Sequence, residues 1–307
     1  CIFSFFMLIC FFIILILMKV PHNIDRWIYG VWWWTLFALS LDSVAQPAEL
    51  PGKKINFEQL PENLGLSQRS INCILQDREG FLWIGTWSGL IRYDGHATTV
   101  FYSGQGEGKL KSNKITSLFE DRMGNLWVGT HMGGVFKYVK KNNQFKQFSH
   151  EEDNPESLSN NNVRGIQEDS EGNLWVGTEY GLNVFDGTHN KFGKFQNNPA
   201  DSRSLSQNFI TDLHFSSQHE LWISTQKGLN RLVRSASDSG YTFERFLYSS
   251  RSEDNDLHNY IIQIDESVTE GKSMIWLSTK KGLMKVGSGE IKNFLVDGTP
   301  SANNLTQ

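Results

Sequence analysis

Short apolar runs of strand length alternate with turn residues along most of this chain, and the alternation returns with a long period. Between residues 77 and 286 one phrase occurs five times, and its intact form is Asp-x-x-Gly-x-Leu-Trp-Val/Ile-Gly-Thr. Its central tryptophans lie 44, 48, 47 and 54 residues apart, at Trp83, Trp127, Trp175, Trp222 and Trp276. A period in the forties with strand-like content is typical of a β-propeller of four-stranded blades. The pattern therefore predicts an all-β chain of this architecture.

The third copy of the phrase shows how one unit divides into four strands. Runs of alternating apolar and polar residues predict strands at residues 163–167, 174–178, 182–185 and 192–195. A turn from Asp169 to Gly172 joins the first two strands. This sequence suits a tight turn, because Asp accepts hydrogen bonds from the backbone amides ahead of it and Gly adopts positive φ without strain.

No single blade of this kind can bury both of its faces, so each blade must stack on its neighbours. We interpret the repeated tryptophan as a plate packed between blades, and Trp127→Ala should then cost about 3–5 kcal/mol of stability. Glycines two positions after the tryptophan belong to the same structural repeat, at Gly85, Gly129 and Gly177. The last two units carry Ser224 and Ser278 at that position.

The two ends of the repeat region predict how it is bounded. Residues 55–60 resemble an outer strand with no blade before it, and such a strand completes the last blade of a closed propeller. Residues 303–307 resemble the opening of a sixth first strand. We therefore expect a linker at 46–54 and the propeller at 55–307, with five repeats, the start of a sixth and an incomplete C-terminal end.

Residues 1–45 carry the signature of an export signal or membrane anchor. Residues 1–18 contain a single polar residue, Ser4, and eighteen apolar residues are at the lower limit for a membrane span. A second interpretation starts translation at Met18, with a basic region, an apolar core at 27–41 and a cleavage site of small residues at 43–45. The second interpretation, a secretory signal peptide, is favoured, and both place the repeats outside the cytoplasm.

Charge and cysteine content narrow the function classes. The formal net charge is −4, and residues 1–45 contribute nothing to it because Lys19 and Arg26 balance Asp25 and Asp42. With no basic stripe, nucleic acid is not expected as a partner. Cys73 is the one cysteine beyond residue 45, so the repeats hold no intrachain disulfide. We expect its side chain to act as a small buried hydrophobe rather than a reactive thiol.

Motifs of catalysis are missing from the sequence. No zinc-ligand spacing, phosphate-binding loop or Gly-x-Ser-x-Gly elbow occurs, and the histidines are scattered. The Asp-x-x-Gly turns lack the alternating oxygen donors and the closing Glu of a calcium loop, so they are interpreted as hairpin turns. We therefore expect no catalytic residue, no metal site and no cofactor in this chain.

A binding site is expected on one face of the propeller. The turn between the second and third strands and the loop that leads to the next first strand emerge on the same face of a four-stranded meander, and both are variable here, with long polar loops at 103–114, 149–162, 196–208 and 248–259. Diversified loops on a regular scaffold are how binding sites are built on rigid folds. Trp87, His131 and Tyr180 lie in these turns on neighbouring units and are the candidate ligand-binding residues, with rim packing as the alternative.

The phrases Leu82–Thr86 and Leu126–Thr130, with the entry phrase Gly65–Ile71, resemble the two-component regulator propeller repeat. The resemblance covers residues 55–307 and implies the periplasmic sensor region of a hybrid two-component histidine kinase. It further implies an oligosaccharide or other small-molecule ligand, a homodimeric receptor, and a membrane helix beyond this chain. The implied cytoplasmic output is a histidine kinase or a diguanylate cyclase.

Two other function classes remain open at this stage. One is a propeller enzyme of the streptogramin-lyase or sialidase type. The lyase would need a metal and a histidine on the binding face, where His131 is the candidate. The sialidase would need an arginine cluster, and Arg164, Arg203 and Arg231 do not fall at equivalent positions of the repeat. The other class is an exported interaction propeller without catalysis.

Overall fold

The computed structural model describes residues 70–234, 240–247, 255–287 and 290–293. The predicted signal or anchor at 1–45, the alternative start at Met18, the linker at 46–54, the strand at 55–60 and the strand opening at 303–307 lie outside the described residues. Within the described part of the chain, no helix is both long and apolar enough to cross a membrane.

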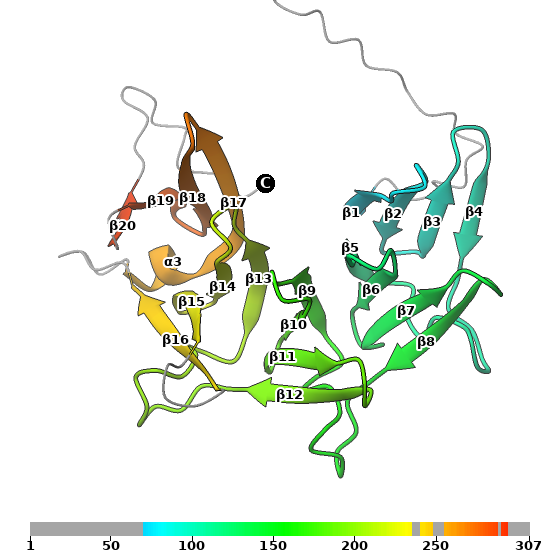
Figure 1. Cartoon of the computed structure of the whole chain (residues 1–307), viewed down its shortest axis with the longest axis horizontal. Coiled ribbons are helices and arrows are strands. Elements are labelled where there is room, and N and C mark those ends of the chain that lie inside the picture. Colours follow the sequence, from blue (N-terminus) through cyan, green and yellow to red (C-terminus); the bar gives the residue numbers. More distant parts are fainter. Residues whose placement is uncertain (1–69, 235–239, 248–254, 288–289, 294–307) are drawn as a thin grey trace, which may run out of the picture. The chain divides into compact units, whose positions relative to one another are not determined.

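Over these residues the chain folds into five four-stranded antiparallel sheets, each formed by four strands that pair in chain order (Figure 1). This confirms the predicted all-β propeller of four-stranded blades. The blades are β1 (Ile71–Gln76), β2 (Leu82–Thr86), β3 (Leu90–Tyr93) and β4 (Thr98–Phe101); β5 (Ile115–Glu120), β6 (Leu126–Thr130), β7 (Val135–Val139) and β8 (Gln144–Phe148); β9 (Val163–Glu168), β10 (Leu174–Thr178), β11 (Gly181–Asp186) and β12 (Lys191–Phe195); β13 (Ile210–Phe215), β14 (Leu221–Thr225), β15 (Gly228–Arg234) and β16 (Tyr241–Phe246); and β17 (Ile261–Thr269), β18 (Lys272–Thr279), β19 (Gly282–Gly287) and β20 (Glu290–Asn293).

The blades stack through their first strands. Contacts run from β1 to β5, from β5 to β9, from β9 to β13 and from β13 to β17, so each blade touches the next one in the chain. In Figure 1 these first strands lie nearest the middle of the blade array, and β4, β8, β12 and β16 lie at its periphery. This arrangement follows from the repeat itself, because each sheet has two apolar faces to cover.

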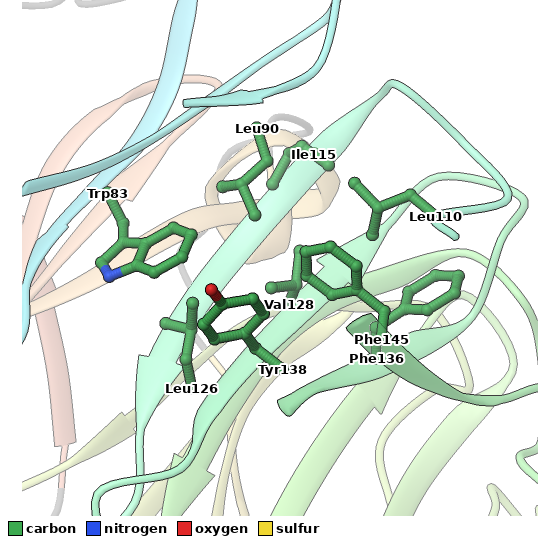
Figure 2. Close-up of a cluster of buried hydrophobic side chains, with 9 residues drawn as sticks. All are labelled: Trp83, Leu90, Leu110, Ile115, Leu126, Val128, Phe136, Tyr138 and Phe145. Atoms are coloured by element: carbon green, nitrogen blue, oxygen red, sulfur yellow. The ribbon is translucent and has the colours of Figure 1, made fainter. Parts of the chain in front are cut away.

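The hydrophobic core is divided into clusters that lie between successive blades. One cluster joins Trp83 and Leu90 of the first blade to Leu126, Phe136 and Tyr138 of the second. Figure 2 shows the indole of Trp83 facing the ring of Tyr138, and their centroids lie 5.1 Å apart in an edge-on arrangement. Edge-on aromatic pairs add to the stabilisation that burial alone provides.

The repeated tryptophans occupy equivalent places in these clusters. The exposed fraction is 4% or less for Trp83, Trp127, Trp175 and Trp222. Trp127 packs edge-on against Phe185 of the third blade, and Trp175 packs in the same way against Tyr241 of the fourth. Trp276 differs, because its side chain is only half-buried.

An aspartate carboxylate holds the indole in each of the first three blades. Trp127 Nε1 donates to Asp121 Oδ2 over 2.8 Å, and the same pair recurs as Trp83 with Asp77 and Trp175 with Asp169. The other oxygen of Asp121 accepts the backbone N–H groups of Met123 and Asn125. The Asp-x-x-Gly turn is thus a hairpin turn whose carboxylate also fixes the tryptophan.

The glycines after the tryptophans allow the next blade to approach. A Cβ atom on Gly129 would lie 2.7 Å from Val163 Cγ1 of the third blade, and one on Gly177 would lie 2.7 Å from Ile210 Cγ2 of the fourth. Gly85 has the same relation to Ile115 of the second blade. Each glycine therefore sits where two first strands meet and leaves no room for a side chain.

On the face of the Asp-x-x-Gly turns, a glutamate of one blade accepts a hydrogen bond from the turn of the preceding blade. The backbone N–H of Arg78 donates to Glu120, and that of Arg122 donates to Glu168 of the following blade. The fourth blade repeats the contact from Ser217 to Glu266. Burial raises the pKa of Glu266, but hydrogen bonds from Ser273, Ser217 and His214 outweigh it and lower that pKa to about 2. Two of these glutamates also form ion pairs with the arginine of the preceding turn, Glu120 with Arg78 and Glu168 with Arg122.

Candidate functional site

The opposite face of the propeller is formed by the turns between second and third strands and the loops that precede the first strands. In the second and third blades the backbone N–H that opens the turn donates to the carbonyl of the residue just before the first strand of the same blade, from His131 to Lys114 and from Glu179 to Asn162. The fourth and fifth blades repeat the bond from Gln226 to Phe209 and from Lys280 to Tyr260. The structure thus confirms that these two sets of loops share one face, called the loop face below.

Buried leucines anchor three of the long loops to the core. Leu110, Leu158 and Leu205 are each fully buried, although they lie in the polar segments 103–114, 149–162 and 196–208. Leu110 packs in the cluster of Trp83, and Leu205 packs in the cluster of Trp175. The fourth loop contains instead a one-turn helix, α3 (Asn255–Asn259), within the segment expected to be irregular. The loops are therefore held in place rather than merely tethered at their ends.

A buried polar network fastens two of these loops. Asn183 accepts the backbone N–H of Ser159, and its amide donates to Ser159 Oγ and to the carbonyl of Val176. Ser159 Oγ also lies 2.8 Å from Thr178 Oγ1. The fourth blade repeats the network with Asn230, Ser206 and Thr225. A satisfied buried network of this kind makes a loop rigid.

A continuous band of aromatic, cationic and amide side chains crosses the loop face. It begins at Trp87, whose indole is 45% exposed and whose ring centroid lies 6.4 Å from that of His131, edge-on. Lys114 Nζ lies 5.4 Å from the centroid of the same indole. This cluster joins the first blade to the second and contains two chemically different contacts for a ligand, an exposed aromatic face and an ammonium group.

The middle of the band is built from the third blade. The backbone N–H of Met132, next to His131, donates to Asn162 Oδ1 over 2.8 Å. Asn162 in turn donates to Glu179, which forms an ion pair with Arg164. The guanidinium of Arg164 lies 5.2 Å from the ring centroid of Phe209 in the fourth blade. These contacts carry the band across two further blade junctions.

The band ends on the fourth and fifth blades. Gln226 Nε2 donates to Tyr260 Oη over 3.0 Å, which crosses the last junction. Lys280 Nζ lies 3.7 Å from the centroid of the Tyr260 ring. The loop-face band is therefore defined by Trp87, Lys114, His131, Asn162, Arg164, Glu179, Phe209, Gln226, Tyr260 and Lys280.

The structure brings two of the three sequence-based candidates together. Trp87 and His131 are in ring contact, whereas Tyr180 makes no ring contact with either of them among the described residues. Tyr180 is 55% exposed, and its carbonyl accepts a hydrogen bond from Gln196. Sequence reasoning missed Lys114, Phe209 and Tyr260. Their position directly before a predicted first strand was the available signal, since this position faces the turn of the same blade.

The loop face presents an exposed aromatic ring, amides and ammonium groups. Exposed aromatic faces bind planar or apolar surfaces, amides donate and accept hydrogen bonds, and ammonium groups pair with anions. Within the described residues, no group of three or more His, Cys, Asp or Glu side chains could hold a metal ion. Burial raises the pKa of the Cys73 thiol to about 12, which keeps it from acting as a thiolate at neutral pH.

Comparison with known proteins identifies the repeats. The family model "Two component regulator propeller" matches residues 65–88, 109–132 and 157–180. No curated protein sequence matches the chain. The second and third matched segments begin one residue before the loop leucines Leu110 and Leu158, and all three end in the turns of the loop face. Each matched segment contains a first strand, an Asp turn and a tryptophan strand.

Solved structures agree with this family. The extracellular domain of BT3049 of B. thetaiotaomicron, assigned as a hybrid two-component system, is 26% identical over 75% of this chain and 30% of its own, with a TM-score of 0.60. The corresponding domain of BT4673 is 25% identical over 75% of this chain and 28% of its own, with a TM-score of 0.57. This chain thus spans about a third of the length of these relatives.

Virginiamycin B lyase of Staphylococcus aureus is also similar, at 14% identity over 76% of this chain and 72% of its own, with a TM-score of 0.53. Identity at that level shows a shared fold and nothing about activity. The matched repeats and the two B. thetaiotaomicron structures go further. They show that this β-propeller carries two-component regulator propeller repeats at residues 65–88, 109–132 and 157–180, and that the chain is similar in sequence and in fold to the extracellular domains of hybrid two-component systems.

Proposed function

We propose that this propeller is the extracytoplasmic, ligand-sensing region of a membrane-bound two-component receptor, and that its ligand is a carbohydrate or another small molecule. The observation that carries the proposal is the loop-face band, in which aromatic, cationic and amide groups, the exposed indole of Trp87 among them, follow one another across all four blade junctions. Its loops are anchored by buried leucines and by the networks of Asn183 and Asn230, so the binding surface is formed before the ligand arrives.

Signalling in this proposal starts from a change in geometry. A ligand that contacts several blades at once favours one arrangement of them, and a receptor can relay that preference only if its two states bind the ligand differently. Two copies of the receptor would pass the change through the membrane to a cytoplasmic histidine kinase or diguanylate cyclase. Similarity to domains described as extracellular supports a location outside the cytoplasm, in the periplasm.

A binding screen tests the proposal. The full-length protein would be titrated calorimetrically with a panel of neutral and anionic oligosaccharides, alongside Trp87→Ala and Met123→Ala variants. Met123 is the matched control, because it is 81% exposed but lies in the Asp turn of the second blade, on the opposite face. We expect binding that Trp87→Ala weakens at least tenfold and Met123→Ala leaves unchanged. Failure of every sugar to bind, or equal losses in both variants, would overturn the assignment of the site.

No specific observation favours a lyase or sialidase. His131 is in contact with Trp87 and close to Lys114, and no carboxylate accepts a hydrogen bond from its ring among the described residues. Arg164 is paired with Glu179, whereas Arg231 is paired with Glu220 and Glu244 at the flank of the fourth blade. These arginines hold the scaffold and do not converge.

A further inference from the structure

The loop-face band has cations whose charge nothing else in the described structure balances. Lys114 lies over Trp87 and Lys280 lies over Tyr260, and within the described residues neither ammonium group has a carboxylate within ion-pair distance. Arg164, the third cation of the band, is paired with Glu179. The two unbalanced charges therefore stand at opposite ends of the band, on the second and fifth blades.

The contrast with the opposite face shows that this is a local feature. There Arg78 meets Glu120, Arg122 meets Glu168 and Lys140 meets Glu79. The chain as a whole carries a net charge of −4, so an excess of positive charge is not a general property of its surface. Lys227 follows Gln226 in its turn and adds a further positive charge to the end of the band.

We propose that the ligand of the loop-face band is an anionic oligosaccharide, which carries carboxylate or sulfate groups. This inference rests on the proposed function and specifies its ligand. At one end the 45%-exposed indole of Trp87 offers a face on which a sugar ring can stack, beside the ammonium group of Lys114. At the other end the ammonium group of Lys280, which lies over the half-buried ring of Tyr260, can pair with an acid on another sugar. A ligand with a single sugar ring would reach one end only, so two anchors favour a chain of several sugars.

The attraction between these lysines and an anionic sugar, and its dependence on salt, follow from the charge and the exposure of the lysines. An ammonium group that lies over an aromatic ring can still attract and pair with an approaching anion. These lysines are close to solvent, so the attraction is screened by salt. Neutral sugars of the same length would keep the stacking contacts and lose the ionic ones.

The experiment compares three probes on the full-length protein by calorimetry. They are a uronate tetrasaccharide, a sulfated tetrasaccharide and a neutral tetrasaccharide, each measured at low and at high ionic strength. We expect at least one anionic probe to bind at least tenfold more tightly than the neutral one, with the advantage lost at high salt. The two anionic probes distinguish carboxylate from sulfate as the recognised group.

Substitutions of the lysines test where an anionic sugar binds. Lys114→Met and Lys280→Met should each weaken anionic binding about tenfold and weaken neutral binding much less, while Lys114→Arg should retain most of the anionic binding. Lys140→Met is the matched control, because it removes the same charge from the ion pair with Glu79 on the opposite face. Neutral and anionic probes that bind equally would overturn the inference and leave the proposed function standing. If no probe binds to the wild type, the inference and the proposed function both fail.

Discussion

The second and fourth blades have the same strand order and the same turn hydrogen bonds, but their aspartate carboxylates lie at different positions. In the second blade Asp121 lies in the turn and accepts the N–H of Trp127, and the first strand has Ser117 at its bulge. In the fourth blade the turn has Ser216, and the bulge of β13 has Asp212. The backbone bonds that close the two turns match, at 3.0 and 2.8 Å in the second blade and 2.9 and 2.9 Å in the fourth.

This difference leaves a measurable defect. Ser216 Oγ accepts the backbone N–H of Glu220, but it does not reach the indole six residues later, and Trp222 Nε1 is buried without a hydrogen-bond partner. Asp212 instead accepts the N–H groups of Leu213 and, across the junction, of Ile264 in the fifth blade. The repeat therefore preserves the shape of the turn more strictly than the chemistry inside it.

The largest expected effect separates the two tryptophans. Trp127→Ala should destabilise the protein by about 3–5 kcal/mol, as for other emptied aromatic sites. The cost of Trp222→Ala should be lower by about 1–3 kcal/mol, because it removes an N–H group that has no partner, whereas Trp127→Ala also takes a donor away from Asp121. Urea unfolding of both variants gives the two values. Phenylalanine at each position is the control for ring volume, and equal losses at the two sites would show that the indole–carboxylate bond contributes nothing.

Sequence patterns predicted the blades well, for a physical reason. Strand alternation, the tryptophan period and the Asp-x-x-Gly turns are local features, and together they anticipated the bounds of all four strands of the third blade to within one residue. They also placed the two sets of variable loops on one face. The spacing of six residues between Asp121 and Trp127 was visible too, but a hydrogen bond between them depends on side-chain direction.

The contacts that cross blade junctions were beyond the sequence. Lys114 meets Trp87 and Gln226 meets Tyr260 only because the blades stack with a particular offset. The same holds for Asp212, whose partner Ile264 is 52 residues away in the chain. Periodicity shows that blades must stack, yet it does not show which polar groups then face each other, and the loop-face band is made of such pairs.

A smaller, pH-dependent effect should belong to the fourth blade alone. Burial is the main cause that raises the pKa of Asp212 from 3.8 to about 6, and the nearby Asp265 adds to it, against the hydrogen bonds from Ile264 and Leu213. Between these two values the folded chain holds a proton that the unfolded chain has released. The contribution of Asp212 to the free energy of unfolding is therefore largest below its unfolded pKa of 3.8 and is lost as the pH rises through its folded pKa of about 6. The loss amounts to up to about 3 kcal/mol.

Unfolding of the wild type and of Asp212→Asn between pH 3.5 and pH 7.5 measures this effect as the difference between two curves. Taking the difference removes the contribution of carboxylates such as Glu266, whose lowered pKa acts in the opposite direction. The expected difference changes between pH 4 and pH 6 and is constant above pH 7. A difference that does not vary with pH would mean that Asp212 titrates as it does in the unfolded chain.

Removal of the turn side chain should distinguish the same two blades. Asp121→Ala takes the acceptor from Trp127 Nε1 and from the backbone N–H groups of Met123 and Asn125, and should cost about 1–3 kcal/mol. Ser216→Ala takes away one acceptor, for the backbone N–H of Glu220, and should cost about 1 kcal/mol or less. Chemical denaturation of the pair measures the gap. Equal costs would contradict the role given to the carboxylate.

The smallest expected effect runs in the opposite direction and repairs the fourth blade. Ser216→Asp places a carboxylate where the second blade has Asp121, and the matching turn should let it accept the N–H of Trp222, with a gain of about 1 kcal/mol. Glu266 of the fifth blade accepts the backbone N–H of Ser217, so a new negative charge close by would be opposed. Ser216→Asn offers an acceptor without that charge and isolates the hydrogen bond. Thermal unfolding that shows no gain for either variant would mean that the N–H of Trp222 is satisfied by solvent, and that the fourth blade has lost nothing by losing its aspartate.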